Sequence, residues 1–165
     1  MLPEDIEVLY KLKLANRDLV EAVKDTKHLQ KNLVKYAESA NEHIQEQYNA
    51  IRRDLAELLR NINIVATTDE EDVIVLLLSK AKVHAERHDI LANGTLDRLI
   101  RNSLITNEMA TSLMNDSAYA YAISKNLIAM AEVAFSNTDN GENLNEEMIM
   151  SDEEVKTILE KKDDE

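Results

Sequence analysis

The sequence predicts an all-α protein, and three observations support this fold class. Two glycines and one proline in 165 residues are too few for a β-sandwich or a doubly wound α/β fold, because such folds use both residues at their many turns. Aromatic residues make up only 4% of the chain. Apolar residues recur at steps of three and four, and this spacing lines one face of a helix. We expect an antiparallel bundle of about three to four main helices over residues 1–136, then an acidic linker and a short C-terminal helix over residues 137–165.

The first predicted helical region begins at Pro3, a residue favoured in the first turn of a helix. From Leu29 to Ile62, apolar residues keep steps of three and four and form a stripe close to a heptad seam. Two interpretations follow: one helix of about sixty residues, or two helices broken near residues 15–18. A helix of about sixty residues would be long for a globular domain and would need a partner along its length.

A loop at residues 61–69 is expected to separate this region from the next helix. Thr68 or Asp69 is the expected cap, and the acidic residues that follow would stabilise the positive end of the helix dipole. This helix is expected to end at Gly94, because glycine is favoured just past a helix. A short helix is predicted over residues 96–102.

The longest apolar stretch without glycine or proline, Leu104 to Phe135, is predicted to form the central helix. Thr106 is the expected N-cap, with Glu108 in the first turn. A helix of about thirty residues would be roughly 45 Å long. Its apolar face is expected to contain Met109, Leu113, Ala120, Ile123, Leu127, Ala131 and Phe135.

The chain is acidic, with a net charge of −13, and the excess is uneven. Residues 138–165 hold eleven acidic residues and three lysines, a charge of −8, which leaves −5 for the preceding part. Such a chain repels phosphate backbones, so we expect no nucleic-acid partner. The C-terminal segment is interpreted as a solvated acidic tail with a short helix, opened by a capping box at residues 151–154.

Signals for membrane insertion and export do not occur in the sequence. No window reaches eighteen apolar residues, so we expect no direct membrane span in this chain. The N-terminus lacks the basic start and apolar centre of a signal peptide. The chain has no cysteine, which excludes disulfides and thiolate metal ligands and fits a reducing compartment.

Two pairs of candidate metal ligands lie one helical turn apart. Glu21 and Asp25 could share a divalent metal ion, but a hard cation takes several oxygen ligands, and solvated charges near Lys24 are the favoured interpretation. His84 and His88 could bind zinc or nickel. The glutamate between them is misplaced for the HExxH pattern of a metalloprotease, so surface histidines are the favoured interpretation of this pair.

Asp116 lies close to the apolar face of the predicted central helix, after Asn115 and before Ser117. If buried, the carboxylate needs a partner, because an unpaired charge inside a protein costs several kcal/mol. A lysine or arginine from a neighbouring helix is the favoured partner; a ligand or another domain is the alternative. Asp116 joins Glu21 and Asp25 as the third candidate metal residue.

Enzyme signatures do not occur in the sequence: it has no Gly-rich phosphate loop, no nucleophile elbow and no cluster of catalytic residue types. We therefore expect no catalytic residues and no cofactor, apart from the divalent metal considered above. Interaction residues are expected instead. They are Asn115, Asp116 and Tyr119 on the central helix, and Leu55 and Leu59 on the long seam, where they would support a homodimer.

Three stretches carry a family resemblance: DLVEAVKDTKHLQKNLVKYA (Asp18 to Ala37), EQYNAIRRDLAELLRNI (Glu46 to Ile62) and LIRNSLITNEMATSLMNDSAYAYAISKNLIAMAEVAF (Leu99 to Phe135). They resemble the cytoplasmic C-terminal region of bacterial sodium/phosphate cotransporter family proteins, a PhoU-like helical bundle. The string MATSLMNDSAYAY is the most specific part. The resemblance implies a regulatory domain on the cytoplasmic side of the inner membrane, whose partner is the membrane transport domain of the same polypeptide.

The resemblance also bears on metal binding. PhoU proteins repeat two three-helix units and hold iron or zinc clusters with acidic pairs at i and i+4. Glu21 and Asp25 match this form, whereas Asp116 is followed at i+4 by Ala120. The function implied is regulation through helix–helix contacts without catalysis. The alternatives are a stand-alone metal- or ligand-binding helical bundle and a coiled-coil dimerisation module.

Overall fold

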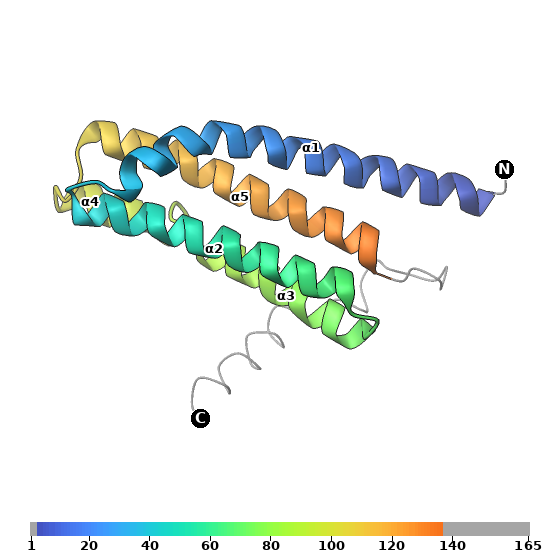
Figure 1. Ribbon diagram of the computed structural model, residues 1–165. Helices are drawn as coiled ribbons and strands as arrows, with labels where there is room; N and C mark the ends of the chain where they lie inside the picture. The colour runs from blue at the N-terminus through green and yellow to red at the C-terminus, as the bar shows by residue number, and fades with distance from the viewer. Residues whose placement is uncertain (1–2, 137–165) are drawn as a thin grey trace, which may run out of the picture.

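The computed structural model describes residues 3–136, and within this range the chain consists of helices and turns (Figure 1). The predicted all-α class is confirmed. The helices are α1 (Pro3–Ala37), α2 (Glu42–Thr67), α3 (Glu71–Arg87), α4 (Thr95–Arg101) and α5 (Asn107–Phe135). The four long helices alternate in direction, and α4 lies at the end of the bundle where α3 leads into α5 (Figure 1). α5 packs against each of the other four helices and is therefore central. The predicted C-terminal segment, residues 137–165, lies outside the described residues.

The first helical region contains a turn that its apolar spacing conceals. α1 runs unbroken through residues 15–18 and ends at Ala37, so both interpretations of this region are wrong. The spacing continues across the turn because Tyr36 before it and Ile44 after it are buried in the same core. A regular apolar stripe therefore does not distinguish one long helix from two helices that fold back on each other.

Short polar side chains end α1 and begin α2. Ser39 Oγ accepts a hydrogen bond from the Asn41 N–H at 3.2 Å, and Asn41 Oδ1 accepts one from the Ile44 N–H at 3.1 Å. Asparagine is a favoured N-cap because its side-chain oxygen satisfies a free N–H group of the first turn. Asn41 Nδ2 also donates to the Leu104 carbonyl at 2.8 Å, which ties this turn to the start of α5.

α1 reaches the core through one buried residue in every seven. Ala15, Ala22, Leu29 and Tyr36 are buried, and each follows the previous one by a heptad. The two large side chains of this series lie in the second half of α1, while the two alanines lie in the first half. The first half therefore packs through small side chains and leaves larger apolar residues in solvent.

The α2–α3 hairpin is tighter than predicted. α2 continues to Thr67 and α3 begins at Glu71, so the expected loop at residues 61–69 is too long. Glu70 occupies the N-cap position of α3 without a side-chain cap, in place of the two residues predicted. Val65 is buried in the core, and this packing outweighs the modest helix propensity of the β-branched residues around it.

α3 ends before its predicted position. Its last residue is Arg87, and Ile90 is buried in the turn that follows. Asn93 Nδ2 donates to the Arg87 carbonyl at 3.0 Å and so satisfies one of the free carbonyls of the last turn. Gly94, expected to end this helix, has a φ of +77° and instead occupies the N-cap position of α4.

α5 follows the sequence prediction closely. Thr106 is the N-cap, and its Oγ1 accepts a hydrogen bond from the Met109 N–H at 3.2 Å. The apolar residues predicted for its inner face all belong to the core or pack against it. Leu113 is fully buried there. The central position of α5 places polar residues of its first half, including Asp116 and Ser117, between the other helices.

Candidate metal site

Asp54 of α2 and His84 and His88 at the end of α3 bring their side chains together. Asp54 Oδ2 lies 2.8 Å from His88 Nδ1, and Asp54 Oδ1 lies 3.9 Å from His84 Nε2. One potential ligand atom from each side chain lies within 4.8 Å of those of the other two. Among residues 3–136, this is the one group of three or more histidine and acidic side chains that comes so close.

The end of α3 sets the orientation of the two histidines. His84 and His88 are one turn apart and therefore project from the same side of α3. Their rings stack with centroids 3.9 Å apart. His88 occupies the C-cap position, where the negative end of the helix dipole favours a positive charge. A cation placed between these rings and Asp54 would meet both the dipole and a carboxylate.

A cavity of about 480 Å³ begins at this group and extends between α2, α3 and α5. Leu58 and Leu77 give it apolar walls, and Ser117 and Ser124 of α5 contribute hydroxyls. Ser117 Oγ is buried and has no hydrogen-bond partner among the described residues. Buried hydroxyl groups are nearly always hydrogen-bonded, so this one is an exception within the described part of the chain.

The metal residues predicted from the sequence lie elsewhere. Glu21 is exposed on α1 and forms an ion pair with Lys24 at 2.7 Å, which agrees with the solvated-charge interpretation. Asp25 is half-buried on the same helix. Asp116 lies on α5 and belongs to no group of three potential ligands within the described residues. The structure does not assemble these three carboxylates into one site.

Asp116 is buried, and its partner is Tyr48 of α2 rather than the lysine or arginine expected. The tyrosine hydroxyl donates to Asp116 Oδ2 at 2.5 Å, the short distance typical of a hydrogen bond to a charged acceptor. Burial, and then this hydrogen bond, raises the pKa of Tyr48 well above its usual range. The prediction of a basic partner is wrong. The apolar periodicity marks Tyr48 as a core residue and gives no sign that its hydroxyl serves as the hydrogen-bond donor. Burial also keeps Asp116 from contacting another protein.

The other predicted interaction residues have mixed surroundings. Asn115 is exposed on α5, whereas Tyr119 is half-buried and stacks on the His28 ring with centroids 5.2 Å apart. Leu55 packs partly against the core, and Leu59 is 56% exposed. Asn115 and Leu59 are therefore the members of this set that present most surface to a partner.

Sequence reasoning found the two histidines but missed Asp54. The missing information is the register of the α2–α3 hairpin. Asp54 lies fifteen residues before Asp69, and His84 lies fifteen residues after it. In an antiparallel helical hairpin that turns at Asp69, residues at equal distances from the turn become neighbours. A correct turn position would have pointed to Asp54.

Comparison with known proteins does not identify a function for this chain. A scan against protein-family models, a search of curated proteins and a search of solved structures each gave no match. In the described part of the chain, no helix has both the length and the apolarity needed to cross a membrane. The exposed surfaces of the bundle and the Asp54–His84–His88 group are thus the features from which function can be argued.

Proposed function

We propose that this chain is a regulatory interaction domain of a sodium-dependent phosphate transporter, acting through helix–helix contacts without catalysis. The family resemblance of residues 18–37, 46–62 and 99–135 suggests the transporter. One structural observation supports the interaction role: the bundle leaves an apolar face of α1 exposed. In this proposal the domain lies on the cytoplasmic side of the inner membrane and contacts the membrane transport domain of the same polypeptide.

The apolar face consists of Val8, Leu12, Leu19 and Val23, which we term the exposed α1 stripe. Their exposed fractions lie between 40% and 63%. Steps of four and seven place these residues along one side of the helix, next to the buried heptad seam. The N-terminal turns of α1 also extend beyond the end of α5 (Figure 1). A helix from another domain could therefore pack along it without displacing any part of the described bundle.

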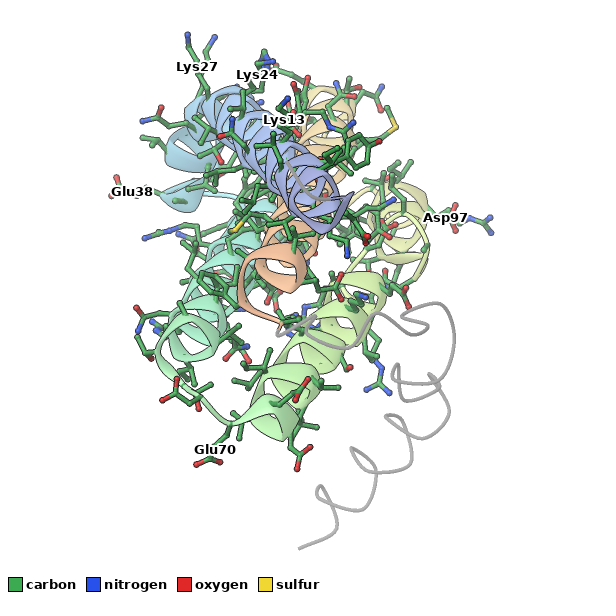
Figure 2. All side chains as sticks on the ribbon, turned by 90° about the vertical axis from the view of Figure 1, so that its right-hand side faces the viewer. Lys13, Lys24, Lys27, Glu38, Glu70 and Asp97 are labelled. Carbon is green, nitrogen blue, oxygen red and sulfur yellow. The ribbon has the colours of Figure 1, made fainter. Side chains whose placement is uncertain are left out.

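Charge beside the stripe adds a second condition for the partner. Lys13 and Lys27 project from α1 into solvent (Figure 2). A partner that complements this surface combines an apolar helix face with carboxylates along one edge. Contiguous exposed apolar surface with a charged rim is typical of protein interaction sites.

The test is binding of the purified chain to a sodium/phosphate transport domain in lipid nanodiscs, with empty nanodiscs as the reference. Leu12 and Val23 together replaced by Asp should weaken binding at least about tenfold, because burying one such side chain contributes about 1.5–3 kcal/mol. The same replacement at Ile64 of α2, which is 45% exposed, is the control. Unchanged binding of the stripe variant, or equal binding to empty nanodiscs, would contradict the proposal.

Homodimerisation remains a separate prediction. Leu59 projects from α2, and Leu33 and Leu55 line the same shallow groove. Sedimentation velocity at several concentrations should show self-association that falls when Leu55 and Leu59 are replaced by alanine. Because Leu55 also packs against the core, the single change Leu59→Ala separates association from folding. A monomer at every concentration would show that α2 provides no dimer contact.

A further inference from the structure

We propose that Asp54, His84 and His88 bind one divalent transition-metal ion of the zinc class, with an open coordination position toward the cavity that Ser117 lines. This site goes beyond the regulatory function proposed above and does not depend on it.

The spacing of the donor atoms suits a small ion. Zinc binds histidine nitrogen and carboxylate oxygen at about 2.0–2.2 Å, so neighbouring ligand atoms of a tetrahedral site lie about 3.4 Å apart. The contacts of Asp54 with His88 and His84, at 2.8 and 3.9 Å, lie on either side of this value. Rotation of the three side chains would bring one donor atom of each, now within 4.8 Å of the other two, to a common ion.

A simple histidine–aspartate pair explains only part of this arrangement. The 2.8 Å contact between Asp54 and His88 is a normal hydrogen-bond distance. The 3.9 Å gap from Asp54 to His84 is too long for a hydrogen bond, yet the His84 nitrogen faces the carboxylate beside the stacked ring of His88. An ion between the three groups would account for the position of both imidazole rings beside the carboxylate.

The donor set favours a transition metal. Imidazole nitrogen suits zinc, nickel and copper, whereas calcium takes six to eight oxygen ligands, more than one carboxylate can supply. The cavity walls hold three carboxylates and two basic side chains, so the charges other than that of the ligand Asp54 balance, and this carboxylate supplies the negative charge for a cation. These charged residues are Asp54, Glu57, Asp89, Lys80 and Arg87.

The open coordination position would face the cavity. Sites with three protein ligands and a free position are the type in which zinc holds water or a small ligand. Ser117 is 6% exposed, lines the cavity that begins at the three ligands, and its Oγ has no partner among the described residues. The cavity, of about 480 Å³, has room for a water or a small ligand held by the ion.

The test is titration of the chelator-treated full chain with zinc, followed by competition with a chromophoric chelator. We expect one ion per chain. His84→Gln combined with His88→Gln, and separately Asp54→Asn, should each lower the affinity at least about 100-fold, since even residues that only orient ligands contribute 10–100-fold. His43→Gln is the control, because His43 is an exposed histidine of the same α2 helix as Asp54. Circular dichroism and thermal melting establish that each variant is folded.

Cobalt gives a second measurement that reports ligand identity. The cobalt-loaded chain should show visible d–d absorption typical of nitrogen and oxygen ligands, and the His84/His88 double variant should lose it. Zinc affinity that survives in both ligand variants would overturn the proposal. So would affinity lost through Glu21→Gln and Asp25→Asn instead, or the absence of stoichiometric binding at micromolar zinc.

Discussion

Asp116 and Asp54 are both held by side chains of a neighbouring helix, yet their surroundings are opposite. Asp116 of α5 is 2% exposed and accepts a hydrogen bond from Tyr48 inside the core. The Asp54 side chain of α2 is 25% exposed and faces two histidines at the edge of a cavity. The first carboxylate is sealed from solvent, and the second can be reached by a solute.

This difference separates a structural role from a binding role. Losing the donor to a buried carboxylate leaves its charge unsatisfied, which is costly, so the Tyr48–Asp116 pair supports the fold. The contacts of Asp54 with the histidines are partly exposed, and surface contacts of this kind contribute only about 0–1 kcal/mol, so we expect them to add little to the stability of the fold. The two regions meet on α5, where Ser117 follows Asp116 and lines the cavity.

The largest effect on stability should come from removing the buried hydrogen bond between Tyr48 and Asp116, which we term the sealed pair. Tyr48→Phe removes the hydrogen bond to the buried Asp116 and should lower the free energy of unfolding by about 2 kcal/mol. Tyr36→Phe is the matched control, since Tyr36 is equally buried but its hydroxyl accepts a hydrogen bond from the exposed Lys35. It should cost under about 0.5 kcal/mol. Urea unfolding of both variants makes the comparison, and equal losses would show that the Tyr48–Asp116 bond has no special weight.

Features that depend on local residues could be predicted from the sequence, and features that depend on tertiary contacts could not. The start of α5 and its inner face could be predicted, because the Thr106 cap and the apolar spacing are local properties. The end of α1 could not, since an uninterrupted apolar period masks the capping residues of the turn. The partners of Asp116 and of the histidines could not either, because both depend on which residues α2 places beside α5 and α3.

Alkaline pH offers a second way to test the sealed pair. The raised pKa of Tyr48 means that this hydroxyl keeps its proton in the folded state, while in the unfolded chain it titrates near pH 10. Its contribution is therefore complete below about pH 10 and is lost as the pH rises above that value, at up to about 1.4 kcal/mol per pH unit. Urea unfolding at about pH 9 and about pH 11 should show a smaller loss for Tyr48→Phe than for the original chain. An identical loss would mean that Tyr48 ionises equally in both states.

The boundary between the two regions can be tested at Ser117. Ser117→Ala removes a buried hydroxyl that has no partner among the described residues, so the metal-free protein should gain up to about 1 kcal/mol of stability. Ser124→Ala is the matched control on the same helix, because Ser124 Oγ donates to the Ala120 carbonyl at 3.0 Å. It should leave stability unchanged or slightly lower. If Ser117→Ala destabilises the protein instead, the hydroxyl has a hydrogen-bond partner in the folded protein.

The smallest effect is expected at the open group. In metal-free protein, Asp54→Asn and His88→Gln should each change the free energy of unfolding by under about 0.5 kcal/mol, because both side chains are partly exposed and their contact is screened by water. Thermal melting without and with zinc provides the measurement. A loss of more than about 1.5 kcal/mol without metal would place Asp54 in the same structural class as Asp116. If disrupting the empty site costs little and the melting temperature rises only with zinc, the stabilisation comes from binding of the ion and not from contacts of the metal-free fold.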